Sequence, residues 1–346
     1  MRISASSIFL ALTYASISAL AQTYTLSSTI VGSEFLSAFS FEAIADPTDG
    51  FVTYVDQSEA QSAGLVSTTS NSFRMGADST SVLSPSGAGR KSVRIKSNAA
   101  YTNHVAVFDL THMPEGCGTW PAIWETDEAD WPNSGEIDIV EGVNNVIPNQ
   151  STLHTGPGCS IPPNGAVAQY GTTVGTDCNA NDNGNAGCGV QSPDSNSFGP
   201  NFNSDGGGYY AMERSSTYIK VWFWSRDSAY IPAAFTNGAS SIDTSTWGEP
   251  TAFFPNTDCN ISSSFGSLNI IINLTFCAYP SPTFAAVADK SVQAVIGLEP
   301  LRFTRRQGAR LPVLTMLPKT LQHSPTPTLT SHPLLSTSRD YLDAGV

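Results

Sequence analysis

The chain alternates short runs of β-branched and aromatic residues with clusters of Gly, Asn, Ser and Pro. Such runs are typical of strands, and such clusters are typical of the turns that join them. We expect strands at residues 105–110, 136–140, 218–224 and 268–276. No stretch keeps a 3.6-residue apolar period over three turns, and no repeat has solenoid or propeller spacing. The sequence therefore predicts an all-β protein that folds as a sandwich or a barrel.

An acidic cluster lies between residues 125 and 141 of a chain in which only 13% of residues are charged. Its seven members are Glu125, Asp127, Glu128, Asp130, Glu136, Asp138 and Glu141. Glu136 and Asp138 alternate with isoleucines, so on a strand these acids would share one face while the isoleucines face the core. Glu141 is out of phase by one residue. A one-residue bulge near Val140 would return it to the acidic face.

Three carboxylates on one face repel one another and cost stability unless a cation or a reaction uses them. A carboxylate pair with separated pKa values is what glycoside hydrolysis requires, because one group donates a proton while the other stays ionised. A solvated acidic strand face and a calcium site are alternatives. The flanking tryptophans disfavour a solvated face. The lack of a carbonyl-rich loop disfavours a calcium site. The Asp-Thr/Ser-Gly elements of aspartic proteases are absent.

The segment from Glu136 to Glu141, EIDIVE, resembles the E-x-D-x-x-E signature of glycoside hydrolase family 16, in the bulged form of its laminarinase-like members. The chain resembles the fungal endo-1,3(4)-β-glucanases of that family in particular. The likeness runs from about Thr23 to Cys277. Other segments that carry it are residues 46–54, 112–124, 151–155, 210–214 and 269–277.

The resemblance implies roles for the three acids. Glu136 corresponds to the nucleophile that forms a covalent glycosyl–enzyme. Glu141 corresponds to the general acid, which turns base when water attacks. Asp138 lies between them and would hydrogen-bond to the nucleophile and tune it.

The same resemblance implies substrate-binding residues. Trp124 and Trp131, with Trp120 beside them, correspond to aromatic walls on which pyranose rings stack. Each of them could instead belong to the core, since large aromatic residues are often buried for packing alone. His154 corresponds to a histidine that lines the cleft, with a structural histidine as the alternative.

The implied fold is a jelly-roll β-sandwich of the concanavalin A-like lectin and glucanase type, with a concave catalytic cleft. The implied activity is endo-acting, retaining hydrolysis of β-1,3-glucan or mixed β-1,3/1,4-glucan, with no cofactor and no metal. A cell-wall glucan transglycosylase is an alternative, because it shares the covalent intermediate. A glucan-binding lectin or a structural wall protein would leave the two glutamates unexplained.

The first residues read as a signal peptide over residues 1–21. Arg2 is followed by an interrupted apolar run, and Ala19-Leu20-Ala21 fits a cleavage site, so we expect a secreted protein whose mature chain begins at Gln22. No later stretch is apolar enough to span a membrane. A net charge of −13 at pH 7 disfavours nucleic acid as a partner. We expect a monomer that binds β-glucan.

Six cysteines accord with secretion and allow 15 pairings. Cys178 and Cys188 flank a loop of Asn, Asp and Gly, which a disulfide would close. A zinc site would need short paired spacings such as C-x₂-C, and none is present. Three glycosylation sequons begin at Asn149, Asn260 and Asn273.

The sequence after Cys277 departs from the family. Such enzymes continue with Gly-Asp-Trp-Ala-Gly, a cysteine pair and a closing strand, whereas residues 278–282 read Ala-Tyr-Pro-Ser-Pro. We therefore expect a catalytic domain over residues 22–300 that lacks its closing strand, and a disordered or aberrant tail over residues 301–346. Because of this departure, a further alternative is that the chain is a catalytically impaired member of the family.

Overall fold

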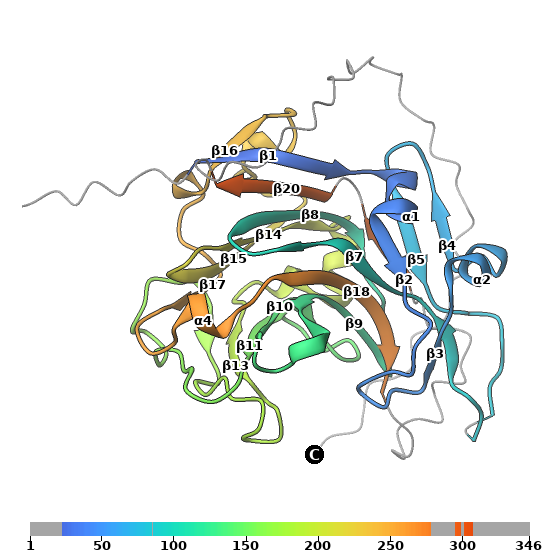
Figure 1. Ribbon diagram of the computed structural model, residues 1–346. Helices are drawn as coiled ribbons and strands as arrows, with labels where there is room; N and C mark the ends of the chain where they lie inside the picture. Colours follow the sequence, from blue (N-terminus) through green and yellow to red (C-terminus); the bar gives the residue numbers. More distant parts are fainter. Residues whose placement is uncertain (1–22, 85, 278–294, 299–300, 307–346) are drawn as a thin grey trace, which may run out of the picture. The chain divides into compact units, whose positions relative to one another are not determined.

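The computed structural model describes residues 23–84, 86–277, 295–298 and 301–306. Two large antiparallel sheets carry most of the described chain (Figure 1). The first sheet has the order β16 (Ser241–Asp243), β1 (Thr23–Ile30), β20 (Leu301–Arg306), β8 (His104–His112), β14 (Gly208–Arg214), β15 (Tyr218–Ser225), β17 (Ala252–Pro255). Three more strands extend it beside β8, namely β19 (Val295–Leu298), β5 (Phe73–Gly76) and β4 (Val66–Thr68).

The second sheet bears the acidic cluster. Its order is β12 (Thr172–Thr173), β13 (Cys188–Gln191), β11 (Gln150–His154), β10 (Glu136–Glu141), β9 (Thr119–Thr126), β18 (Leu268–Phe276), β7 (Arg94–Tyr101), β2 (Phe39–Phe41). A short parallel pair joins β3 (Val52–Tyr54) to β6 (Arg90–Ser92). All other strand pairs between named strands of the described residues are antiparallel.

Helices in the described residues are short. The α-helices are α1 (Phe35–Ala38), α2 (Gln57–Ser62), α3 (Gly199–Ser204) and α4 (Ile261–Ser264). Single 3₁₀ turns are η1 (Gly32–Glu34), η2 (Glu128–Asp130), η3 (Ser195–Ser197), η4 (Ala233–Phe235) and η5 (Thr244–Thr246). No helix among them is long and apolar enough to cross a membrane.

The predicted all-β class is confirmed, and so are the four expected strands. Residues 105–110 lie within β8, residues 136–140 within β10 and residues 218–224 within β15, while residues 268–276 are β18 itself. These runs form strands because β-branched and aromatic side chains pack well on a pleated surface that is buried.

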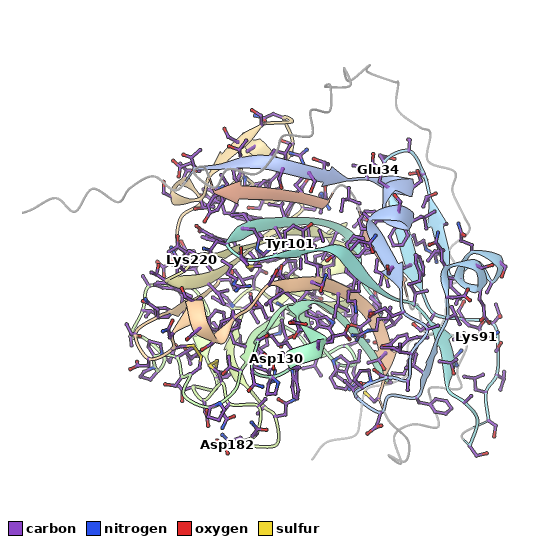
Figure 2. All side chains as sticks on the ribbon, in the orientation of Figure 1. Glu34, Lys91, Tyr101, Asp130, Asp182 and Lys220 are labelled. Carbon is purple, nitrogen blue, oxygen red and sulfur yellow. A yellow bond between two sulfur atoms is a disulfide. The ribbon has the colours of Figure 1, made fainter. Side chains whose placement is uncertain are left out.

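The central strands of the first sheet, β8, β14 and β15, are apolar on both faces. On β8, Phe108 and Leu110 face the main core between the sheets, whereas Val105 and Val107 face a second cluster. That second cluster contains three tryptophans and Phe235 of η4. Figure 2 shows how densely side chains fill the space around both sheets. Burial on two sides explains why these strands read as continuous apolar runs and not as alternating ones.

The expectation that the chain lacks a closing strand is wrong. β20 lies between β1 and β8 and pairs with both, and β19 pairs with β5 and β8. The expected domain end at residue 300 therefore cuts the sheet just before β20. The C-terminal segment as a whole is rich in proline, which is typical of a tail without strands. It nevertheless contains a six-residue strand, LRFTRR, whose three arginines resemble those of a solvated tail. Residues 307–346 lie outside the described residues.

Two disulfides are present among the described residues. Cys178 pairs with Cys188, as predicted, and Cys159 pairs with Cys259. Cys117 and Cys277 are free thiols, so the expectation of disulfides is confirmed for four of the six cysteines. The expected signal peptide, residues 1–21, lies outside the described residues.

The position of β20 predicts a difference between two truncated chains. A chain that ends at residue 308 keeps β20 and serves as the reference. A chain that ends at residue 300 leaves β1 and β8 without their shared partner, and we expect its melting temperature to fall by roughly 10 °C or more. Circular dichroism melts check this, and equal melting temperatures for the two truncated chains would contradict the pairing.

Candidate active site

A β-bulge in β10 places its three acids on one face. Asp138 pairs with Trp124 of β9, but Val140 pairs with the adjacent Ile123, so β10 holds one extra residue between these two pairs. Ile139 and Val140 are consecutive and both belong to the main core. The next residue, Glu141, is thereby returned to the face of Glu136 and Asp138, and the predicted one-residue bulge is confirmed.

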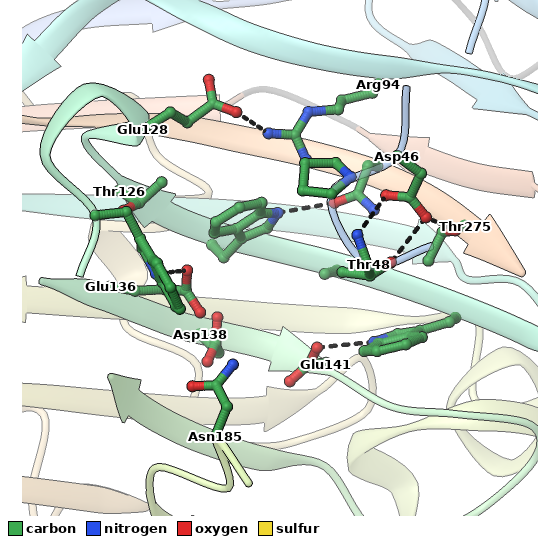
Figure 3. A pocket seen from close by; sticks show the side chains of 16 residues that line it. Asp46, Thr48, Arg94, Thr126, Glu128, Glu136, Asp138, Glu141, Asn185 and Thr275 are labelled. Carbon is green, nitrogen blue, oxygen red and sulfur yellow. Dashed lines mark hydrogen bonds and ion pairs between the residues drawn. The ribbon is translucent and has the colours of Figure 1, made fainter. Parts of the chain in front are cut away.

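The acidic face opens into a cavity of about 340 Å³ (Figure 3). Its lining includes the three acids of β10 and the three tryptophans that the sequence pointed to, Trp120, Trp124 and Trp131. Trp120 and Trp124 come from alternate positions of β9, so period 2 brings them to the same face as the acids of β10. Trp131 lies in the turn between η2 and β10 and is 41% exposed. A cavity with aromatic walls suits sugar rings, whose apolar faces can stack on the indoles.

Two of the tryptophans also donate hydrogen bonds to the glutamates. The indole N–H of Trp131 donates to Glu136 Oε2 at 2.8 Å, and that of Trp120 donates to Glu141 Oε1 at 2.7 Å (Figure 3). Each bond favours the ionised form of the carboxyl that accepts it. The sequence indicated these tryptophans as sugar platforms and gave no sign that they contact the acids.

Proton affinity is high in this cluster. Burial raises the pKa of Glu136 and of Glu141 well above the ordinary range for glutamate, and the adjacent Asp138 carboxylate raises both further. Opposing effects come from His154 and from the two indole donors. The site can therefore keep a carboxyl protonated near neutral pH, which is the property that a general acid needs.

His154 of β11 lies beside the acids and is 7% exposed. Its Nε2 is 3.3 Å from Asp138 Oδ2 and 3.9 Å from Glu136 Oε1, because Glu136 and His154 face each other across the β10–β11 ladder. Burial opposes its charge, yet contacts with Asp138 and Glu136 outweigh burial and raise the pKa of His154 to about 9. A substrate contact for His154 stays a prediction. Its observed polar contacts are with Asp138, with Glu136 and with Asn185, whose Oδ1 is 2.8 Å from His154 Nδ1.

One end of the cavity is built by a hydrogen-bonded chain behind Trp124. Its indole N–H donates to Asn273 Oδ1 at 2.8 Å, and Asn273 Nδ2 donates to the hydroxyl of Tyr54 at 3.2 Å. The guanidinium of Arg94 lies 5.1 Å from the centre of the Trp124 ring. Arg94 is itself ion-paired with Glu128 of the acidic cluster and with Glu42, and Lys96 contacts the same two carboxylates, so these charges balance one another.

Glu125 lies on the opposite side of β9 from this cavity. It is completely buried, and its Oε1 is 2.9 Å from Nε2 of His104 on β8. Glu125 is therefore separate from the acids that line the cavity. Side chains alternate between the two faces of β9, so Glu125 points away from the cavity while its neighbours Trp124 and Thr126 line it.

One set of groups in the described chain is compact enough to hold a metal ion. Glu136, Asp138 and His154 each offer an atom within 4.8 Å of the other two. The contact of His154 with Asp138 accounts for this closeness as an ion pair.

Comparison with known proteins supports the resemblance. A family profile described as the XgeA-like catalytic GH16 domain matches residues 39–296, well beyond Cys277, where we expected the likeness to end. The endo-1,3(4)-β-glucanase xgeA of Emericella nidulans is 44% identical over 259 residues, which are 74% of this chain and 40% of that protein. The chain thus spans less than half of that relative's length.

Similar solved structures also belong to glycoside hydrolase family 16. Laminarinase 16A of Phanerochaete chrysosporium, determined with β-glucans in both donor and acceptor sites, is 49% identical and superposes with a TM-score of 0.79 over 82% of this chain and all of that one. An elongating GH family 16 β-1,3-glucosyltransferase is 36% identical, with a TM-score of 0.74 over 82% of this chain and all of that one. The described chain accordingly has the jelly-roll sandwich that the resemblance implied.

The Trp120 contact predicts a change in the titration of Glu141. Replacing Trp120 by Phe keeps an aromatic ring but removes the N–H that stabilises the ionised carboxyl, so the pKa of Glu141 should rise further. Trp124→Phe is the matched control, because that indole donates to Asn273 and not to a carboxylate. Carbon-13 NMR titration of labelled glutamate carboxyls measures both. An equal shift of the Glu141 titration in the two variants would contradict the role of the N–H.

Proposed function

The chain belongs to glycoside hydrolase family 16 as an XgeA-like member, and on this premise we propose that it is an endo-acting β-glucanase. It hydrolyses β-1,3-glucans, and mixed β-1,3/1,4-glucans, with retention of anomeric configuration. The observation that carries the proposal is the pair Glu136 and Glu141, which face one aromatic cavity from the two sides of a bulge. Relatives named endo-1,3(4)-β-glucanases, and a laminarinase with β-glucans in its donor and acceptor sites, support the substrate class.

Glu136 is the nucleophile in this proposal. Its carboxylate attacks the anomeric carbon, the glycosidic bond breaks, and a covalent glycosyl–enzyme forms. Burial and Asp138 raise the pKa of Glu136, and two groups oppose this rise and favour the attacking carboxylate: the N–H of Trp131, and His154, whose own pKa is raised to about 9. Asp138 holds that histidine in place, 3.3 Å from its carboxylate.

Glu141 is the acid and then the base. Burial raises its pKa, so it can hold the proton that the leaving sugar oxygen takes as the bond breaks. The same carboxylate then removes a proton from water, which attacks the glycosyl–enzyme and releases the sugar with its original configuration. Trp120 keeps Glu141 directed into the cavity through its 2.7 Å hydrogen bond.

Transglycosylation is a second candidate function. A structure named as an elongating β-1,3-glucosyltransferase is 36% identical over the same part of the chain, and both reactions pass through a glycosyl–enzyme. The two differ only in whether water or a sugar hydroxyl attacks that intermediate. Incubation with laminari-oligosaccharides at high concentration separates them, because only transfer yields products longer than the substrate.

We also propose that the protein is secreted. The apolar N-terminal run with its Ala19-Leu20-Ala21 site supports export. The two disulfides support it too, since disulfides persist in oxidising compartments.

The carboxylate roles predict different losses in two variants. Glu136→Ala should reduce laminarin hydrolysis by at least about 10³-fold, and azide should partly restore turnover by forming a glycosyl azide in the vacated space. Glu141→Ala should retain activity on aryl glucosides, whose good leaving groups need little protonation. Glu59→Ala, which removes an exposed ion pair with Lys91, serves as the control and should keep full activity. Reducing-sugar assays and mass spectrometry of the azide product measure these outcomes, and full laminarin hydrolysis by either glutamate variant would refute the proposal.

Retention predicts the anomer that is released first. Proton NMR during the first minutes of laminarin cleavage should show the β-anomer, with the α-anomer appearing later by mutarotation. If the α-anomer comes first, the pair works by inversion and Glu136 is not a nucleophile.

A further inference from the structure

The loop between Cys178 and Cys188 lies against the end of β11, which carries His154. Its disulfide closes a separation of 10 residues, and Asp182 marks the loop in Figure 2. Two backbone hydrogen bonds attach it to Thr155, the residue after β11. Thr155 N donates to Cys178 O at 2.8 Å, and Ala180 N donates to Thr155 O at 2.9 Å. The loop is therefore fixed to the strand at the point where the histidine is held.

The backbone of this loop is adapted to a close approach. Asn183, Gly184, Asn185 and Gly187 all have positive φ, between 51° and 65°. Asparagine is among the few residues that tolerate this region, so Asn185 can hold a left-handed turn and still present a side chain. A Cβ at Gly187 would lie 2.7 Å from Leu153 O and 2.8 Å from His154 Cε1. Only glycine lets the loop pack so closely on the histidine ring.

Asn185 and Asp138 contact the two ring nitrogens of His154. Asn185 Oδ1 is 2.8 Å from Nδ1, and Asp138 Oδ2 is 3.3 Å from Nε2. When both nitrogens carry protons, Nδ1 donates to Asn185 Oδ1 and Nε2 forms an ion pair with the Asp138 carboxylate, so the ring is held from both sides. The charged groups that face the ring are Asp138, Glu136 and, farther along β10, Glu141, whereas the loop faces it with the neutral Asn185.

We propose that Asn185 is a positioning residue that fixes the His154 ring against Asp138 and beside Glu136. The role in turnover rests on the proposed function, but the contact with the ring does not. Nothing in the sequence marked Asn185 among the many Asn, Asp and Gly residues of this loop. Its side chain is directed toward Asp138 at the wall of the cavity (Figure 3).

Three variants of this loop test the proposal. Asn185→Gly keeps the left-handed backbone and removes Oδ1, while Asn185→Asp keeps an acceptor oxygen. Asn183→Gly is the matched control, because Asn183 also has positive φ, 51°, and its side-chain amide donates to Asp177 and not to His154. The ring nitrogens of His154 are followed by ¹⁵N NMR without substrate and are assigned by comparison with His154→Gln. Laminarin hydrolysis is measured on the same samples.

We expect Asn185→Gly to shift the Nδ1 signal of His154 and to speed its exchange with solvent. We also expect it to lower kcat roughly three- to tenfold, as the loss of one hydrogen bond would, with KM changed less than about twofold. Asn183→Gly should resemble the parent in both respects, whereas Asn185→Asp should keep the contact with Nδ1 and, as an added carboxylate, raise the pKa of His154 further. This pattern separates a positioning role from a general weakening of the loop, since Asn183→Gly would share the latter.

Three results would overturn the proposal. Unchanged His154 signals in Asn185→Gly would show that the contact does not fix the ring. A changed signal with an unchanged kcat would show that the ring position does not affect turnover. A raised KM with an unchanged kcat would make Asn185 a glucan contact instead. The NMR result is readable even if the parent protein cleaves no glucan, so failure of the proposed function is distinguished from failure of this inference.

Discussion

Repulsion among the three carboxylates on one face of β10 is the constraint that the site must satisfy. The bulge brings Glu141 to the same face as Glu136 and Asp138, and burial makes each negative charge there more costly. One histidine and two indole N–H groups offset part of this repulsion. His154 lies beside Asp138, and each glutamate accepts a hydrogen bond from one indole. A site that gathers acids and supplies few positive charges must hold protons near neutral pH, and this requirement connects the fold to its acid–base chemistry.

Much of this site could be predicted from local sequence, because period 2 and one bulge fix the direction of each β10 side chain. The alternation of Glu136 and Asp138 with isoleucines gave the face, and the one-residue offset of Glu141 gave the bulge. β18 was predicted to the residue, since a long apolar run bounded by polar turns has few other solutions. The Cys178–Cys188 disulfide was predictable because the two cysteines are only 10 residues apart and flank a loop of Asn, Asp and Gly.

What could not be predicted depends on contacts between segments far apart in the chain. Glu125 looks like a member of the acidic cluster, but its partner His104 lies on a strand of the other sheet. Asn185 contacts His154 only because a loop folds back on β11. β20 was missed because a short strand with basic residues gains its stability from partners on both sides, β1 and β8, and composition does not reveal partners.

The place of β20 also bears on the order in which the chain can fold as it leaves the ribosome. β1 begins at Thr23, yet its main neighbour in the sheet is the last described strand, and Tyr24 pairs with Arg306. The antiparallel neighbours β8, β14 and β15 are complete some eighty residues earlier and can pair as soon as they emerge. The first of the described strands to be synthesised must therefore wait for nearly the whole described chain. Until then its backbone groups on that side have only water or another protein to bind, which is the state that chaperones recognise during synthesis.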